Sequence, residues 1–384
     1  MKKSLPFVVW LLVSLIPYAH TQTHTEKVDT VAIAKIKEEG MERSQLMEIL
    51  RNLTDVHGPR LSFSPGFAAA ANYSKQTMES WGLSNVHFDP WGMNGKGWSL
   101  KKFSLEMTAP TYTPITSYPK AWSPGIKGTA SGEVVVMKVN SEEDLANYKG
   151  KLKGKFVMMD LPPVIRFGWD PIAARVHDST LLKYANYEET SGTYRYRPGG
   201  SENVTYKKWK LCMDEGAIAV ISPSPGRGDN GAMTIAGAYL PIAPETPRDQ
   251  RPRILDPNAP PTLPQVALLS EHYNRLYRLV EHGTPVKLDL TLGVQITPSV
   301  EGFNVIAEIP GTDLKDEVVM IGAHLDSWHS GTGTTDNAAG SSVCLEAIRI
   351  LKSLGLQPRR TIRIALWGGE EQGLLGSRGY VKKH

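Results

Sequence analysis

Two apolar, β-branched runs separated by an amphipathic helical pattern constrain the carboxy-terminal part of this sequence most strongly. The runs are Val318–Ala323 and Thr361–Trp367, and both are typical of buried strands in a parallel sheet. Between them, Ala338–Leu354 places its apolar residues on one helical face, and Gly355 is a typical stop signal. A strand, a crossover helix and a second strand in this order place the two strands in parallel. The sequence therefore predicts an α/β domain here, with a further strand at Asn304–Ile309.

Polar residues follow directly after both predicted strands. His324 and Asp326 come after the first strand, Glu370 and Glu371 come after the second, and Asp336 leads into the helix. Ligands of open α/β sheets bind at the carboxyl ends of the strands, so we expect these five side chains to converge. Four carboxylates share a small site only when cations neutralise them. Histidine and carboxylates without cysteine are typical of zinc or a similar divalent ion.

The spacing of these residues suggests a role for each. Asp326, two positions after His324, is placed to accept the second N–H of the imidazole and fix its tautomer. Asp336 at a helix start can present both oxygens and bridge two ions about 3.5–4 Å apart. Of the adjacent Glu370 and Glu371, one can bind metal while the other accepts a proton from a metal-bound water.

The stretch from Asn304 to Gly379 resembles the co-catalytic di-zinc exopeptidases, the family of aminopeptidase Y and glutamate carboxypeptidase. The resemblance rests on Gly322–Trp328 and Trp367–Gly373, and is greatest to the carboxypeptidase Q (plasma glutamate carboxypeptidase) branch. It implies an α/β fold with a mixed, mostly parallel sheet flanked by helices and an inserted β-rich protease-associated domain. It also implies two zinc ions and the following roles: His324, Asp336 and Glu371 as metal ligands, Glu370 as the catalytic base, and Asp326 as the residue that orients His324.

The rest of the chain divides into three predicted segments. Residues 1–21 combine Lys2 and Lys3 with a short apolar run, which is typical of a secretory signal peptide. Residues 22–120 are expected to form the amino-terminal helical part of the catalytic domain, with a helix at Pro65–Trp81 and a Gly- and Trp-rich loop at Trp91–Trp98. Residues 121–297 carry short strand-like runs and are expected to be the inserted domain, and residues 298–384 the catalytic domain. The predicted strands of the inserted domain are Glu133–Met137, Lys155–Asp160, Ala217–Ile221, Val266–Leu269 and Val286–Leu292, with helices at Tyr206–Glu215 and Glu271–Glu281.

Composition narrows the classes of partner. The hydrophobic fraction is 41% and the charged fraction 21%, which is typical of a globular chain and excludes collagen, coiled coil and intrinsic disorder. The formal net charge is only +4, and two of the positive charges lie in the predicted signal peptide. We therefore expect no nucleic-acid partner and, after signal removal, no membrane partner. The two cysteines are too few for a disulfide scaffold, and we expect two separate buried thiols.

The function expected from these features is that of an exported, secreted or periplasmic zinc exopeptidase that hydrolyses dipeptides or short peptides. A homodimer is left open. Two alternatives stay open: an aminopeptidase acting on longer peptides, and a non-catalytic peptide- or protein-binding homologue. The family pattern has a further Asp ligand and a late His ligand after the Glu pair, whereas this chain ends at His384. We therefore expect a truncated catalytic domain, inactive as it stands, with open apolar surface along Thr361–Trp367.

Overall fold

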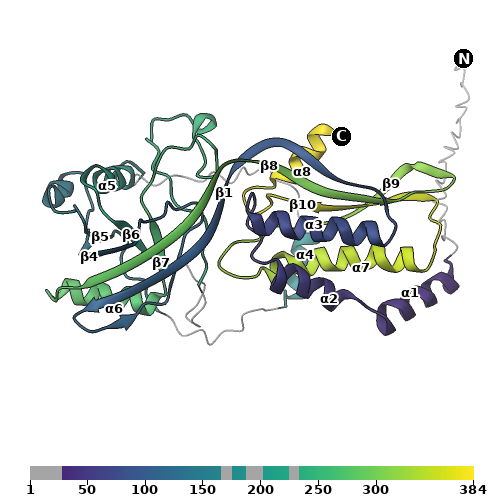
Figure 1. Cartoon of the computed structure of the whole chain (residues 1–384), viewed down its shortest axis with the longest axis horizontal. Coiled ribbons are helices and arrows are strands. Elements are labelled where there is room, and N and C mark those ends of the chain that lie inside the picture. The colour runs from purple at the N-terminus through teal and green to yellow at the C-terminus, as the bar shows by residue number, and fades with distance from the viewer. Residues whose placement is uncertain (1–27, 166–174, 187–201, 225–232) are drawn as a thin grey trace, which may run out of the picture.

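The computed structural model describes residues 28–165, 175–186, 202–224 and 233–384. The predicted signal peptide lies outside these residues. Two groups of helices and short strands lie at opposite ends of the molecule and are joined by the two long strands β1 (Ser84–Ala109) and β8 (Lys287–Ile309) (Figure 1). None of the described helices is long and apolar enough to cross a membrane.

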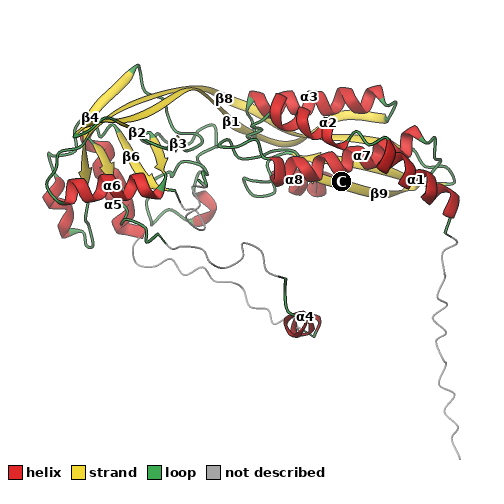
Figure 2. Ribbon diagram, turned by 90° about the horizontal axis from the view of Figure 1, so that it is seen from below, coloured by secondary structure: helices red, strands yellow, loops and turns green. Residues whose placement is uncertain are grey.

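The helices gather in two places. Seen from below, α1, α2, α3 and α7 lie together at one end of the molecule, and α5 and α6 lie at the other (Figure 2). Their bounds are α1 Thr30–Glu42, α2 Leu46–Arg51, α3 Pro65–Ser80, α4 Asp178–Ala185, α5 Glu202–Glu215, α6 Ser270–Glu281, α7 Ala339–Ser353 and α8 Leu375–Lys383. The predicted helices Pro65–Trp81 and Ala338–Leu354 agree with α3 and α7 to within one residue at each end. Ser64 caps α3 by accepting from Phe67 N, and Gly355, the predicted stop signal, follows α7 with a φ of 63°.

The described strands form one ten-stranded sheet with both parallel and antiparallel pairs. Along the main path the order is β2-β1-β8-β4-β5-β6-β7-β3, while β10 joins β8 and β9 joins β10. The remaining bounds are β2 Thr113–Pro114, β3 Ser117–Pro119, β4 Thr129–Val136, β5 Phe156–Met158, β6 Ala219–Pro223, β7 Gln265–Leu268, β9 Leu314–His324 and β10 Arg360–Trp367. This mixed α/β arrangement, flanked by helices, confirms the expected fold class.

The predicted strand–helix–strand unit is present. β9 and β10 pair in parallel, and α7 is the crossover between them. α2, α3 and α7 bury their apolar faces against the sheet in one core, to which Ile49, Phe67, Leu345 and Val305 belong. A second core, including Phe156, lies at the other end of the molecule between β4–β8 and α6.

The predicted loop at Trp91–Trp98 is wrong, because these residues lie within β1. Glycines are typical turn signals, but here they allow another segment to approach a strand closely. A Cβ atom on Gly95 would lie 2.4 Å from the ring of Phe63, and one on Gly97 would lie 2.8 Å from the carbonyl oxygen of Phe63. The expected helical segment 22–120 therefore ends in a 26-residue strand.

Two further expectations have mixed outcomes. Cys212 is buried and Cys344 is half-buried, and both are free thiols. Open apolar surface does occur in the carboxy-terminal part of the chain, but on β9 rather than β10. Val318, Val319 and Met320 are 43%, 46% and 40% exposed, whereas β10 lies between β8 and β9 and exposes only Arg360.

Candidate metal centre

The register of two strands places the predicted site residues at one edge of the sheet. In the parallel pair β9–β10, the last residues His324 and Trp367 lie opposite each other. Leu325 N then donates to Trp367 O at 2.7 Å, so the segments that follow β9 and β10 leave the sheet side by side. The segments that carry Asp326 and the Glu pair are therefore adjacent, as expected for the carboxyl ends of parallel strands.

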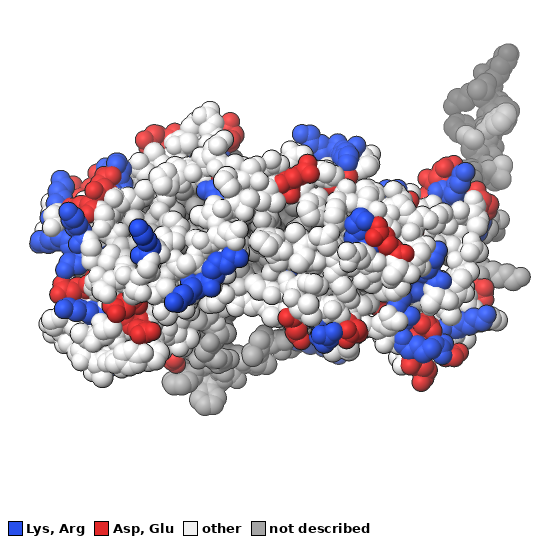
Figure 3. Space-filling model, in the orientation of Figure 1, with Lys and Arg blue, Asp and Glu red and all other residues white. Residues whose placement is uncertain are grey.

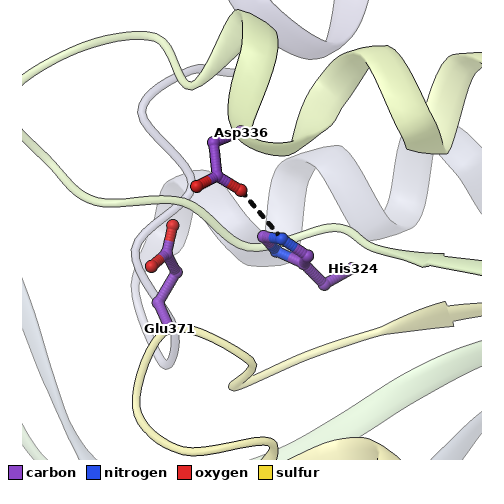
Figure 4. Close-up of side chains that lie close together, drawn as sticks. All are labelled: His324, Asp336 and Glu371. Carbon is purple, nitrogen blue, oxygen red and sulfur yellow. Dashed lines mark ion pairs between the residues drawn. The ribbon is translucent and has the colours of Figure 1, made fainter. Parts of the chain in front are cut away.

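Three of the predicted ligands converge. His324, Asp336 and Glu371 come from β9, the turn before α7 and the turn after β10, and each offers a ligand atom within 4.8 Å of the others. Nε2 of His324 lies 3.0 Å from Oδ1 of Asp336, and the carboxylate of Glu371 points toward this pair (Figure 4). Within the described residues, this is the one such group of three or more potential metal ligands.

The ring of His324 is held so that one nitrogen faces this group. Nδ1 lies 3.0 Å from the backbone carbonyl oxygen of Asp326, which accepts its proton. Ser341 Oγ also donates to the backbone carbonyl of His324 at 2.8 Å. Nε2 is consequently the nitrogen available to a metal, with the neutral tautomer that metal binding needs.

Asp326 acts through contacts different from those that its spacing suggested. Its carboxylate Oδ1 lies 3.7 Å from Nδ1 of His324, beyond hydrogen-bond distance, so the carbonyl rather than the carboxylate holds the ring. The fully buried carboxylate instead accepts from the backbone N–H groups of Glu370 and Glu371, at 3.1 and 3.2 Å, and from Ser62 Oγ at 3.0 Å. Asp326 therefore ties the end of β9 to the turn that carries the Glu pair.

Glu370 and Asp336 lie at the solvent side of the cluster. Glu370 Oε2 is 3.8 Å from Nε2 of His324. Glu370 therefore lies beside the three converging residues but is not one of them. The side chain of Asp336 is 74% exposed, and a cis peptide bond joins it to Asn337. The site is thus open toward solvent on the side of Asp336.

The carboxylates of the cluster favour the binding of a cation. Burial, and then the negative charges of Asp336 and Asp326, raise the pKa of Glu371 to about 7. Burial lowers the pKa of His324, but the carboxylates of Asp326 and Glu370 outweigh this effect and raise it to about 9. One imidazole nitrogen and two carboxylates, without cysteine, fit a borderline divalent cation such as zinc.

Buried residues that were not predicted from the sequence support the cluster. Arg60 is fully buried, and its guanidinium donates to the backbone carbonyls of Leu53, Leu325, Thr332 and Gly333 at 2.6–3.0 Å. Burial, countered in part by Asp326, lowers the pKa of Arg60 to about 10. These bonds fix the loop between β9 and α7 on which Asp336 stands. A single arginine in a Gly-Pro-Arg segment carries no sequence signal for this role.

An α/β sheet whose parallel strand ends gather a histidine and several carboxylates offers a candidate metal-binding site. Residues 304–384 match the sequence profile of Peptidase family M28. The resemblance stated from the motifs is thereby confirmed.

Relatives extend the similarity over nearly the whole chain. Human carboxypeptidase Q is 27% identical over 354 residues, which are 92% of this chain and 64% of that protein. The chain thus spans about two thirds of the length of this curated relative, at 64%. A crystal structure of a Peptidase M28 precursor from Shewanella amazonensis is similar in fold, with a TM-score of 0.57 and 23% identity over 92% of this chain and 70% of that one. BSAP, described as a zinc aminopeptidase from Bacillus subtilis, aligns at a TM-score of 0.50 and 18% identity over 88% of this chain and 64% of that one.

Proposed function

We propose that the protein is an exported zinc exopeptidase that hydrolyses dipeptides or short peptides with a free terminus. The observation that carries this proposal is the convergence of His324, Asp336 and Glu371 at the end of a parallel strand pair. Support comes from the family match of residues 304–384 and from the names of the relatives, which include a carboxypeptidase and a zinc aminopeptidase.

The residues of the site divide the chemical work as follows. His324, Asp336 and Glu371 hold zinc, which when bound polarises a carbonyl and makes water a nucleophile at neutral pH. Glu370, beside the cluster, takes a proton from the attacking water and returns it to the leaving amine. Asp326 orients His324 through its carbonyl and holds the Glu370–Glu371 turn through its carboxylate.

Hydrolysis of matched peptides tests the proposal in the whole protein. A panel with free termini, with a blocked amino terminus and with a blocked carboxyl terminus shows which end is recognised. Cleavage of amino-blocked peptides favours a carboxypeptidase, and cleavage of carboxyl-blocked peptides favours an aminopeptidase. Cleavage of doubly blocked peptides, or activity unaffected by a chelator, would contradict a zinc exopeptidase. Tight peptide binding without any hydrolysis would favour the non-catalytic alternative.

The 384-residue chain itself should bind about one zinc ion and hydrolyse peptides poorly. Two ions need more protein ligands than these three, since a catalytic zinc ordinarily holds three protein ligands and a water. Metal analysis after dialysis measures the stoichiometry directly. Two tightly held ions per chain, or chelator-sensitive turnover by this chain, would show that further residues complete the centre.

We propose further that residues 121–297 act as an inserted domain and that residues 1–21 direct export. The first proposal is supported by the core that includes Phe156 and Leu288, which shares no residue with the core around Ile49 and Val305. Fusing residues 1–21 to a reporter that is active only outside the cytoplasm tests the second proposal. An inactive, cytoplasmic reporter would refute it.

A further inference from the structure

A cavity of about 530 Å³ lies beside the metal centre on the other side of a shared wall. Segment 58–66 forms this wall: Leu61 lines the cavity, whereas the neighbouring Ser62 bonds Asp326 at 3.0 Å. His329, from the loop that follows Asp326, lines the cavity as well. The volume lies within the range of about 300–1,000 Å³ that is typical of small-molecule sites.

The interior of the cavity is aromatic. Four rings follow one another along its wall, with centroids 6.1 Å apart for Phe103 and Tyr118, 5.5 Å for Tyr118 and His329, and 5.1 Å for His329 and Trp98. Trp98 is 1% exposed, and its indole N–H donates to the carbonyl of Ser123 at 2.8 Å, so the wall is fixed. The buried rings of Trp98 and His329 thus support the half-buried rings of Phe103 and Tyr118, on which another flat apolar group can pack.

The mouth of the cavity is cationic. Lys101 and Lys102 both line it, although adjacent residues of a regular strand face opposite sides. A register shift between Leu100 and Lys102 in the β1–β8 pair accounts for this, because a bulge turns neighbouring side chains to one side. Among the described residues that line the cavity there is no acid, and neither lysine has an ion-pair partner there.

We propose that this cavity binds a small ligand with an aromatic body and a carboxylate, held by the ring wall and by Lys101 and Lys102. A free aromatic acid and the carboxy-terminal aromatic residue of a peptide offer the same chemistry. The metal cluster is on the Ser62 side of the wall, so binding in the cavity does not require zinc. A ligand in the cavity also contacts segment 58–66, which positions Asp326. This contact links the cavity to the metal centre.

Binding of two matched probes to the metal-free chain tests the proposal. N-acetyl-tryptophan carries the ring and the carboxylate, and N-acetyl-tryptophanamide differs only in lacking the charge. Removing zinc with a chelator excludes capture of the carboxylate by the metal. We expect calorimetry or ligand-observed NMR to show that the acid binds about fivefold to tenfold more tightly than the amide, with the difference shrinking at high ionic strength.

Paired lysine variants locate the binding. K101Q/K102Q should reduce acid binding to the level of the amide, while K101R/K102R should retain it. The exposed pair Lys151 and Lys153, remote from the lining, gives the control K151Q/K153Q with the same loss of charge. Equal affinity of the acid for both neutralised proteins, or equal affinity of wild type for acid and amide, would overturn the proposal. Circular dichroism verifies that each variant is folded.

A third probe distinguishes the two sources of the ligand. An amino-acetylated tetrapeptide ending in tryptophan competes with N-acetyl-tryptophan in the same assay. Tighter binding of the peptide identifies a peptide end as the occupant, and tighter binding of the single residue identifies a free aromatic acid. If the two probes do not compete, or if K101Q/K102Q leaves their competition unchanged, the assigned site is refuted, whatever the peptidase assay shows.

Discussion

At the scale of single residues, the two adjacent glutamates should separate metal binding from proton transfer. Glu370→Gln keeps the size of the side chain but cannot accept a proton, so we expect turnover to fall by about 10²–10⁴-fold in an active form of the protein, with unchanged zinc content. Glu371→Gln is the matched control, and should lose zinc because Glu371 belongs to the converging group. Activity assays and metal analysis on both variants measure this. Loss of zinc by Glu370→Gln alone would mean that the two roles are exchanged.

His329 provides a pH dependence that is separate from the metal ligands. Burial lowers its pKa to about 4, against a weaker opposing effect of its hydrogen bond with the carbonyl of Pro119. Its ring neighbours Trp98, Tyr118 and Trp328 carry no charge at acid or neutral pH. The unfolded chain therefore takes up the proton near pH 6.5, while the folded chain stays neutral until about pH 4.

This difference should reduce stability as the pH falls from about 6.5 to about 4, by up to roughly 3 kcal/mol. Above that window His329 contributes no pH dependence, because both states are neutral. In His329→Gln, which keeps an N–H donor but has no proton to gain, the free energy of unfolding should fall less steeply over the same window. Urea unfolding at a series of pH values measures both slopes, and equal slopes would contradict the assignment.

Residue chemistry also explains what the sequence could predict of the site. Short-range sequence patterns were enough to predict His324, Asp336 and Glu371, because the strand ends of one parallel pair meet at one edge of the sheet. Arg60 and Ser62 could not be predicted from the sequence, because they lie more than 250 positions before Leu325 and Asp326, to which they donate hydrogen bonds. The contact of Asp326 was predicted with the wrong oxygen, since spacing alone does not distinguish a carbonyl from a carboxylate.

At the scale of elements, glycines in strands set how closely other elements approach. A Cβ atom on Gly302 in β8 would lie 2.1–2.3 Å from the indole of Trp91 in β1. Gly302→Ala should therefore destabilise the protein by about 1–3 kcal/mol through overpacking. Gly331→Ala is the control, since a Cβ there meets nothing within 4 Å, and its effect should stay within about 0.5 kcal/mol. Thermal or urea unfolding of both variants decides, and equal stabilities would contradict the packing argument.

The close contact between Gly302 and Trp91 also shows why β1 was not predicted from the sequence. Regular alternation and β-branched runs identify a strand, whereas Trp91–Trp98 combines glycines with tryptophans in a pattern typical of loops. What makes this segment a strand is pairing with β8 over almost its whole length, which includes several register shifts. Helices α3 and α7, by contrast, were predicted well because their start and stop signals and apolar faces lie within or directly beside the helix.

At the scale of the whole molecule, charge and apolar surface are distributed differently. Basic and acidic side chains are dispersed over the face shown in Figure 3, without a continuous basic area. The apolar exception is β9, which among the described strands pairs only with β10 and exposes Val318, Val319 and Met320. An exposed apolar edge strand is a surface on which copies of a chain associate.

We therefore expect self-association of this chain to depend on β9. The double change Val318→Lys and Met320→Lys places charge along one face of the strand and should reduce the mass found by light scattering at high protein concentration. Val31→Lys with Met41→Lys is the control, since these residues are 64% and 82% exposed and lie on helix α1, outside the sheet. A mass that both double variants leave unchanged would exclude the β9 edge as the association surface.

The continuity of β1 and β8 through both ends of the molecule has a practical consequence for protein engineering. A chimera that exchanges one end for that of a relative cannot be joined in a flexible linker, because the connection is a pair of hydrogen-bonded strands (Figure 1). Both cuts must fall at residues that face each other, such as Phe103 and Leu292. Displacing one junction by a single position would turn every following side chain to the opposite face and expose the core that it was meant to cover.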